Sequence, residues 1–546
     1  MTIEHPVTRF SAKAAENPAA PFLHQPMGAT WRTYSFEEVD NIARKIASGL
    51  LAQGYNKGDR IALMSQNSAD WIIVDIAIMM AGMVSVPIYP TAGADTVRHV
   101  LRHSKSKAVF LGEIEDETVA EAIDGPLKIA LTACKINCEL SLESLVNGYE
   151  LLESIELPRE SDLMTIVYTS GSTGTPKGVG LTYRNMVAGA VALGEIFARG
   201  PNRVLSYLPL AHVAERSFVA MGAFYNSVEI FFNESLDTFA RDLQHANVTA
   251  FISVPRLWAK FQTQVFDEIP PDTLQSLLES EQGATVAAKI RDKMGFGNCR
   301  VFLSGTAPIS ASLLRWYYDI GVDIMEGWGM TETSGVACAN MPFKNERIGS
   351  IGVPVNSVEM RLSDESEILV RGDSILERYY LNPTADEESF VDGWFRTGDC
   401  AQLEKDGSWK IIGRVKELFK TAKGKYVAPV PIESELLSNP HAEQVCVVGS
   451  GLGQPFALIV LSKHTSEQTG ELTASLTRTL EVTNSRLEPH EKLSGLLVVA
   501  HPWTVSNELL TPTYKLKRVN IEQYYKSIID NVLISAVQWE AALKSA

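Results

Sequence analysis

Short apolar runs alternate with segments of helix length through much of the chain. Four such runs lie at 60–64, 84–89, 107–111 and 127–132, and segments such as 95–103 separate them. Parallel strands need a long crossover connection, which is usually a helix, so this alternation predicts parallel sheets with helices packed on them. The same pattern returns in the apolar runs at 204–208, 248–254 and 300–304.

Two helices can be predicted in the first part of the chain. Ser35 and Glu38 form a capping box, and apolar residues then recur at helical spacing as far as Gly54. The stretch 71–90 is mostly apolar but is interrupted by Asp75, Gly82 and Pro87. It fits a buried helix followed by a strand better than a membrane span, although peripheral contact with a membrane stays open.

The texture of the sequence changes at about Ile351. Short strand-like runs with Gly and Asp turns follow, for example at 367–372 and 409–413, and they are typical of a small barrel or an antiparallel sheet. After Gly413 comes a further compact unit with its own apolar runs at 445–449, 457–461 and 497–500. The predicted fold class is therefore α/β: a large N-terminal domain of parallel α/β subdomains plus a small barrel-like subdomain, followed by a small α+β C-terminal domain.

Charge and cysteine content exclude several classes of protein. The 546 residues include 49 Lys and Arg against 65 Asp and Glu, and this net charge of −16 argues against a protein that coats nucleic acid or an anionic membrane. The six cysteines are scattered without a CxxC pair, so neither a metal cluster nor a disulfide framework is expected. The first residues lack a basic segment followed by an apolar one. We therefore expect a cytoplasmic protein.

The strongest chemical signal is the string Tyr168-Thr-Ser-Gly-Ser-Thr-Gly-Thr-Pro-Lys-Gly-Val179, which follows an apolar run. Its glycines let backbone N–H groups approach anionic oxygens, its hydroxyls donate further hydrogen bonds, and Lys177 adds a positive charge. Such a loop can hold a polyphosphate. It is not a Walker A loop, because Pro176 precedes the lysine and Gly178 follows it.

This string resembles the phosphate-binding signature of the adenylate-forming superfamily, which includes acyl-CoA synthetases, firefly-type luciferases and peptide-synthetase adenylation domains. Further segments are similar in the same order. They are the adenine-side loop at 304–309, the nucleotide segment Glu326-Gly-Trp-Gly-Met-Thr-Glu-Thr333, the ribose-binding turn at 393–399, the hinge at 413–420 and the lysine loop Thr511-Pro-Thr-Tyr-Lys-Leu-Lys-Arg518. The segment 208–216 and this last loop look most like long-chain fatty acyl-CoA synthetases.

The resemblance implies the residues of an ATP site. The phosphates would be bound by Thr169, Ser170, Gly171, Ser172, Thr173, Gly174 and Lys177. The adenine and the rest of the nucleotide would be bound by Gly305, Thr306, Ala307, Glu326, Gly327, Trp328, Gly329 and Thr331, with Asp399, Arg414 and Lys420 contributing from later segments. Trp328 would stack on or wall the adenine, and the carboxylate of Asp399 can accept hydrogen bonds from both ribose hydroxyls.

The resemblance also implies four catalytic residues, Thr331, Glu332, His212 and Lys515. Glu332 is a hard oxygen ligand suited to Mg²⁺ beside the triphosphate, and Thr331 would donate to a phosphate oxygen. His212 would guard the acyl and carboxylate pocket. Lys515 would neutralise charge where a carboxylate meets the α-phosphate; at about 4 Å and an effective dielectric of about 20 this contributes roughly 4 kcal/mol, or about a thousandfold in rate.

The implied organisation has a large AMP-binding domain at 1–413, a hinge at 414–416 and a small mobile domain at 417–546. Lys416 occupies the hinge position, where many relatives have Asp and luciferases have Lys. After a rotation about this hinge, a basic patch would face the phosphates of CoA. The patch consists of Arg414, Lys416, Lys420, Lys423 and Lys425.

The leading functional hypothesis is ATP-dependent activation of a medium- to long-chain fatty acid as acyl-AMP, followed by thioester formation with CoA. ATP, Mg²⁺ and CoA are the expected cofactors, and fatty acid, ATP and CoA are the expected substrates, with no nucleic acid and no transmembrane segment. Three alternatives remain open: delivery of the acyl group to a carrier-protein thiol or another acceptor, closure of a hydroxy acid, and a nucleotide-responsive binding protein without turnover.

Overall fold

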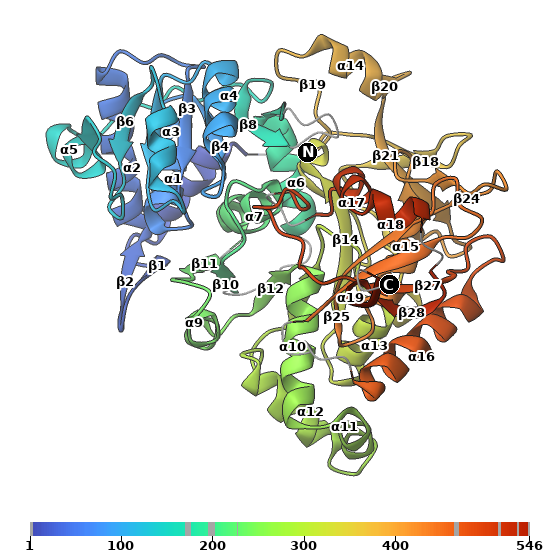
Figure 1. Ribbon diagram of the computed structural model, residues 1–546. Helices are drawn as coiled ribbons and strands as arrows, with labels where there is room; N and C mark the ends of the chain where they lie inside the picture. The colour runs from blue at the N-terminus through green and yellow to red at the C-terminus, as the bar shows by residue number, and fades with distance from the viewer. Residues whose placement is uncertain are drawn as a thin grey trace.

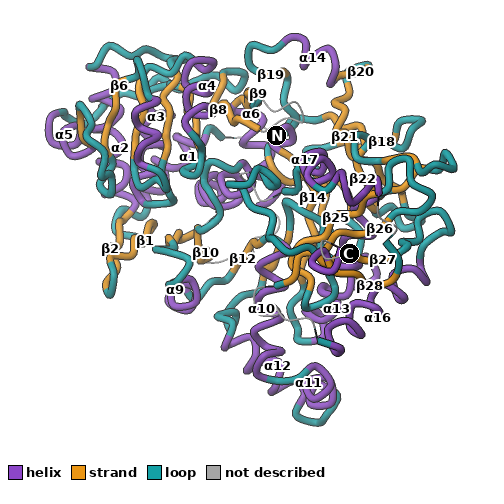
Figure 2. The backbone as a smooth tube through the Cα atoms, viewed as in Figure 1, coloured by secondary structure: helices purple, strands orange, loops and turns teal. Residues whose placement is uncertain are grey.

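A computed structural model gives the fold and describes residues 4–169, 176–194, 202–226, 228–462, 469–511, 515–531 and 534–543. Figure 1 shows the N-terminal sheet and its helices α2, α3 and α5 on one side of the molecule and the C-terminal elements on the opposite side. Figure 2 shows by secondary structure that helices flank the strands of the N-terminal sheet and of the C-terminal unit. The protein therefore has the predicted mixed α/β architecture.

The largest sheet has eight strands in the order β19-β9-β8-β4-β3-β5-β6-β7. The strands are β3 (Arg60–Met64), β4 (Val84–Ile88), β5 (Ala108–Leu111), β6 (Leu127–Ala130), β7 (Leu140–Ser141), β8 (Leu163–Thr169), β9 (Lys177–Thr182) and β19 (Arg378–Tyr379). From β8 to β7 neighbouring strands are parallel, as predicted, whereas β9 is antiparallel to both β8 and β19. The antiparallel edge closes the phosphate-loop segment into a hairpin, which the alternation of runs does not predict.

Helices of this part cover both faces of the sheet. They are α1 (Pro6–Glu16), α2 (Phe36–Ala52), α3 (Ala69–Met80), α4 (Ala94–Ser104), η1 (Glu117–Ala122) and α5 (Leu142–Gly148). The Ser35 hydroxyl accepts from the Glu38 N–H at the start of α2, as the capping box predicts. Every residue of α3 is buried, so its apolar character reflects a core position. No helix of the described residues is both long and apolar enough to cross a bilayer.

Two further sheets complete the α/β part. The first has the order β10-β11-β1-β2, with β1 (Pro21–Met27), β2 (Thr30–Ser35), β10 (Asn202–Ser206) and β11 (Val228–Phe232). The second has the order β12-β13-β14-β15-β16, with β12 (Ala250–Ser253), β13 (Val301–Ser304), β14 (Ile324–Met330), β15 (Gly335–Ala339) and β16 (Val353–Pro354). Strands β12, β13 and β14 are parallel, so their carboxyl ends lie side by side.

The connections of these sheets are mostly helical. They are α6 (Tyr183–Gly194), α7 (Val213–Glu215), the π-helix η2 (Arg216–Met221), α8 (Gly222–Tyr225), α9 (Phe239–Ala246), α10 (Pro255–Glu268), α11 (Pro271–Leu278), α12 (Gly283–Lys293) and α13 (Ala311–Asp319). Two short 3₁₀ turns, η3 (Thr331–Thr333) and η4 (Asn345–Arg347), follow β14 and β15. A π-helix is rare and is frequently found at functional sites, which directs attention to the segment around Arg216.

An antiparallel sheet follows, as the change of texture predicts. Its order is β17-β18-β21-β20, and β22 also pairs with β21. Its elements are β17 (Glu359–Leu362), β18 (Glu367–Arg371), α14 (Pro383–Ser389), β20 (Phe390–Val391), β21 (Trp394–Leu403) and β22 (Trp409–Arg414).

The C-terminal unit has its own sheet and its own cores. Its strands are β23 (Phe419–Lys420), β24 (Tyr426–Val427), β25 (Ala442–Val448), β26 (Phe456–Leu461), β27 (Gly495–Val498) and β28 (Ala536–Trp539). Its helices are α15 (Pro429–Leu436), α16 (Gly470–Arg486), α17 (Arg518–Tyr524), α18 (Lys526–Asn531) and α19 (Glu540–Leu543). Alternate residues of β25 enter two apolar clusters, one on each face of the sheet. Both clusters are built from residues after 418, so this unit has a core of its own.

Candidate active site

The ends of the glycine-rich loop are fixed by strand pairing. Thr169, the last residue of β8, pairs with Lys177, the first residue of β9. The predicted phosphate-binding residues between them, Ser170, Gly171, Ser172, Thr173 and Gly174, lie outside the described residues. The pairing of β8 with β9 places Lys177 beside Thr169.

Helix α4 holds this hairpin from one side. His99 and His103 are one turn apart on α4, with ring centroids 5.5 Å from each other. The His99 Nε2 lies 3.0 Å from the Pro176 carbonyl oxygen, and the His103 Nδ1 lies 2.8 Å from the Tyr168 hydroxyl. Two histidines therefore bind both ends of the loop segment.

Glu332 lies in the 3₁₀ turn η3, directly after β14, and is 9% exposed. Its Oε1 accepts a hydrogen bond of 2.9 Å from the Tyr379 hydroxyl. Burial raises the pKa of Glu332, while its own backbone N–H, the Tyr379 hydroxyl and the charges of Arg414 and Lys515 act in the opposite direction. The carboxylate is thus surrounded by donors and positive charge.

Tyr379 was not identified from the sequence. Its ring also faces Lys177, whose ammonium lies 5.5 Å from the ring centroid. It comes into the site because β19 pairs with β9, placing Tyr379 opposite Val179. A pairing between strands so far apart in the chain leaves no local sequence signal.

Asp399 lies on β21 and is 7% exposed. Its Oδ2 accepts from the Trp328 indole Nε1 at 2.9 Å, and its Oδ1 lies 2.8 Å from the Arg414 Nε. Asp399 and Arg414 are also paired residues of β21 and β22, so the register of the sheet sets the ion pair. Three of the predicted nucleotide-binding residues therefore form one connected group.

His212 is the N-cap of α7, and its Nδ1 accepts from the Ala214 N–H at 3.1 Å. Burial, together with the charge of Lys515, lowers the pKa of His212 to about 4. The ring is therefore neutral at pH 7, and because Nδ1 accepts, its proton is on Nε2.

Lys515 comes from the C-terminal unit, on a turn in which the Lys515 N–H donates to the Thr511 Oγ1 at 3.0 Å. Lys515 is an exposed residue, although protein atoms pack around its ammonium group. This surrounding and the charge of Arg414 lower the pKa of Lys515, while Asp399 and Glu332 raise it. The ammonium is thus within electrostatic reach of both carboxylates and of His212.

The carboxyl ends of β13 and β14 form the floor of this group. Glu326 is paired with Ser304, and burial raises the pKa of Glu326 to about 8. A Cβ on Gly329 would lie 1.9 Å from the Gly335 carbonyl oxygen, so only glycine fits there. Next to this floor lie Gly305, Thr306 and Ala307 after β13, Gly327 within β14 and Thr331 in η3.

Lys420 is placed differently. It lies on the β23–β24 hairpin, where its ammonium is 4.7 Å from the ring centroid of Tyr426. Within the described ranges no hydrogen bond or ion pair joins it to the group around Asp399. In this arrangement of the two units Lys420 is therefore not among the residues that the structure brings together.

Glu332 is suited to hold a magnesium ion together with a substrate. No group of three or more His, Cys, Asp or Glu side chains among the described residues could hold a metal alone. Mg²⁺ usually takes one or two protein carboxylates and completes its shell with waters and substrate phosphates. A single buried carboxylate between the phosphate-loop hairpin and Lys515 fits this mode of binding.

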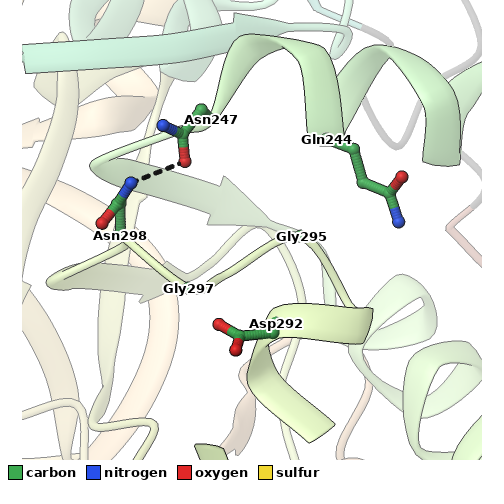
Figure 3. Close-up of a pocket in the computed structure, with 6 residues that line it drawn as sticks. All are labelled: Gln244, Asn247, Asp292, Gly295, Gly297 and Asn298. Carbon is green, nitrogen blue, oxygen red and sulfur yellow. Dashed lines mark hydrogen bonds between the residues drawn. The ribbon is translucent and has the colours of Figure 1, made fainter. Parts of the chain in front are cut away.

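A separate surface hollow of about 320 Å³ lies near the ends of α9 and α12 (Figure 3). It is lined by Gln244, Asn247, Asp292, Gly295, Gly297 and Asn298, and the Asn298 Nδ2 donates to the Asn247 Oδ1 at 2.8 Å. None of the predicted site residues lines it. Its polar lining residues are exposed, and nothing in it suggests chemistry.

Comparison with known sequences finds matches along nearly the whole chain. The sequence profile of a family described as AMP-binding enzyme matches residues 10–380, and that of the AMP-binding enzyme C-terminal domain matches residues 417–535. A long-chain-fatty-acid–CoA ligase, FadD15, from Mycobacterium bovis is 31% identical, with 95% of each chain covered. Fatty acyl-CoA synthetase A from Dictyostelium discoideum is 30% identical, with 92% of this chain and 86% of that protein covered.

Solved structures share the fold at lower identity. The adenylation domain of a carboxylate reductase from Mycobacterium chelonae superimposes with a TM-score of 0.81 at 21% identity, covering 100% of this chain and 92% of that one. The o-succinylbenzoate CoA synthetase MenE from Bacillus subtilis, in complex with ATP and a magnesium ion, gives a TM-score of 0.73 at 23% identity, covering 94% and 99%.

Proposed function

The chain belongs to the AMP-binding enzyme family, and from that premise we propose that it is an AMP-forming ligase that joins a medium- to long-chain fatty acid to CoA. Relatives named long-chain fatty acid–CoA ligases and acyl-CoA synthetases match it over nearly its whole length. The observation that carries the proposal is that Lys515, from the C-terminal unit, lies within electrostatic reach of Glu332, Asp399 and His212, which come from three other segments.

The first half-reaction makes a poor acyl donor reactive. A carboxylate cannot expel oxide, so its oxygen attacks the α-phosphorus of ATP, the bond to pyrophosphate breaks, and acyl-AMP forms. Both reactants are anionic, which makes electrostatic stabilisation the main task of the site. Lys515 is proposed to supply positive charge between the carboxylate and the α-phosphate, and Lys177 to bind the departing phosphates.

His212 is proposed to orient the fatty acid. It is neutral and carries its proton on Nε2, because Nδ1 is engaged by the Ala214 N–H. A neutral Nε2–H donates a directed hydrogen bond to a carboxylate oxygen without neutralising its charge. The carboxylate therefore keeps its nucleophilic character while it is aimed at the phosphorus.

The nucleotide is proposed to be held by residues of β14, η3 and β21. Asp399 keeps acceptor capacity for ribose hydroxyls, since an ionised carboxylate offers about four lone-pair sites and Trp328 and Arg414 use two. Trp328 stands beside the strand-end floor and is proposed to wall the adenine. Glu332 would hold Mg²⁺, which neutralises phosphate charge when bound.

The second half-reaction needs the CoA thiol to reach the acyl carbonyl, which expels AMP and leaves a thioester. Residues 414–416 are proposed as the hinge about which the C-terminal domain, 417–546, rotates. In the present arrangement Lys515 is within electrostatic reach of Glu332 and Asp399, whereas Lys420 contacts Tyr426, and this fits the adenylating state. After rotation, Lys420, Lys423 and Lys425 are proposed to face the CoA phosphates. A cytoplasmic location is also proposed, supported by free thiols at all six cysteines.

The deciding experiment is pyrophosphate release across fatty acids of graded length, with and without CoA. We expect release with fatty acid and ATP, and AMP and acyl-CoA when CoA is added. Lys515→Ala should slow adenylation about a thousandfold while transfer from preformed acyl-AMP to CoA stays measurable. Lys517→Ala, two residues further along, is the matched control. Turnover that is complete without CoA would instead favour a carrier protein or another acceptor.

A further inference from the structure

Backbone contacts fix the position of Tyr379 and therefore the place from which its side chain enters the site. It pairs with Val179 through β19 and β9, and the next residue, Tyr380, donates its N–H to the Gly178 carbonyl at 2.7 Å. The Tyr379 N–H itself donates to the Asp386 Oδ1 at 2.6 Å. The side chain is 6% exposed. Its position is thus locked to the strand that begins with Lys177.

The side chain contacts two groups of opposite charge. Its hydroxyl donates to the Glu332 Oε1 at 2.9 Å, and its ring face is 5.5 Å from the Lys177 ammonium, within the range of a cation–π contact. Within the described part of the chain Lys177 forms no ion pair with Glu332 or any other carboxylate, and the Tyr379 side chain contacts both charged groups. A buried carboxylate and a nearby ammonium attract strongly when nothing separates them.

We propose that Tyr379 is a positioning residue for the magnesium–triphosphate complex: it fixes the rotamer of Glu332 and keeps that carboxylate apart from Lys177. Each charge is then available to the substrate, the carboxylate to the metal ion and the ammonium to phosphate oxygens. This inference rests on the proposed function. It adds a role for a residue that the proposed mechanism does not otherwise use.

Tyr379→Phe removes only the hydroxyl and keeps the ring, its packing and its contact with Lys177. Hydrogen bonds to charged groups contribute more than neutral ones, so we expect ATP binding in the presence of Mg²⁺ to weaken about tenfold. ATP binding in EDTA should stay within about twofold of wild type, because the ring and Lys177 are retained. Tyr380→Phe is the matched control, since the Tyr380 hydroxyl is 3.5 Å from its nearest partner, the Ser104 carbonyl.

A second variant tests the separation of the charges. Tyr379→Leu removes the ring as well as the hydroxyl, so Glu332 and Lys177 can pair directly. We expect it to weaken ATP binding in EDTA too, by roughly tenfold, because Lys177 is then engaged. A thermal unfolding curve for each variant shows that the protein under test is folded.

Calorimetry with ATP, without fatty acid, measures both variants in Mg²⁺ and in EDTA. Equal weakening of Tyr379→Phe in Mg²⁺ and EDTA, or no weakening in either, would overturn the inference, as would wild-type binding that is indifferent to Mg²⁺. The proposed function fails separately, if the wild-type protein releases no pyrophosphate with any fatty acid. Wild-type turnover combined with normal Mg²⁺-dependent binding by Tyr379→Phe would remove only the role of Tyr379.

Discussion

Two arginine–carboxylate pairs serve the same site in different surroundings. Arg216 and Asp75 lie inside the N-terminal unit, with side chains 1% and 4% exposed, and the Arg216 Nη2 donates to both carboxylate oxygens at 2.6 and 2.9 Å. Arg414 and Asp399 lie at the junction with the C-terminal unit, and the Arg414 side chain is 47% exposed. The buried pair belongs to a fixed framework, whereas we propose that the half-exposed pair exchanges partners when a nucleotide binds or the units move.

The buried pair connects the segments that carry the site. The Arg216 Nη1 also donates to the Thr165 Oγ1 on β8, the strand that leads to the phosphate loop. The neighbouring Ser217 donates to the Ser334 carbonyl, two residues after Glu332. His212 lies just before this π-helix. The π-helix therefore fixes three functional segments relative to one another.

Asp75→Asn should have the largest effect on stability. Removing one partner of a buried pair leaves an uncompensated charge and costs about 3–5 kcal/mol. Asp399→Asn, at the half-exposed pair, should cost about 1 kcal/mol or less while it impairs ATP binding. Urea unfolding of both variants measures the difference. Similar losses of unfolding free energy would contradict the distinction between a framework pair and an exchangeable one.

Glu215 makes the framework sensitive to pH. It is fully buried, accepts from the Ser206 hydroxyl at 2.8 Å, and has a second oxygen without a partner; burial raises its pKa to about 8. Unfolded, it titrates near its ordinary value of 4.5. Between these values the folded state holds a proton that the unfolded state releases, so Glu215 lowers stability as the pH rises.

Glu215→Gln removes this titration. From about pH 5 to about pH 8 the unfolding free energy of the wild type should fall by roughly 3 kcal/mol relative to Glu215→Gln. Denaturation at several pH values gives the two curves. Parallel curves would show that Glu215 is ionised in the folded protein.

The sequence predicts the local parts of this architecture and misses the contacts between them. The buried helix α3 and the strand after it were predicted, because apolar runs of the right length are a local signal. Asp75 was noted only as an interruption of that helix, and its role became visible when the fold brought Arg216 to it. Trp328 was expected to wall the adenine, and no local pattern indicates that its indole N–H reaches Asp399 on another sheet. Tyr379 was missed for the same reason.

Trp328→Phe tests how the carboxylate of the half-exposed pair, Arg414 and Asp399, is oriented. The variant keeps an aromatic wall but loses the donor to Asp399, so the carboxylate is held by Arg414 alone. A hydrogen bond to a charged group contributes about 1.5 kcal/mol, and ATP affinity should fall about tenfold. Calorimetry with ATP measures it, and thermal unfolding should change little. Unchanged affinity would mean that Arg414 suffices to orient Asp399.

The smallest effect is expected where the two units touch at the surface. Arg256 on α10 forms an ion pair with Glu443 on β25, and the Arg256 side chain is 56% exposed. Such pairs contribute about 1 kcal/mol or less, and salt screens them. If this pair favours the arrangement with Lys515 near Glu332 and Asp399, Glu443→Gln shifts the population away from it. Adenylation should then slow by up to about fivefold, while thioester formation from preformed acyl-AMP does not slow.

In about 0.5 M salt the wild type and Glu443→Gln should adenylate at similar rates, because the wild-type pair is screened as well. A difference that persists in high salt, or that affects both half-reactions equally, would mean that Glu443 acts on the fold of the C-terminal unit and not on the balance between its two positions.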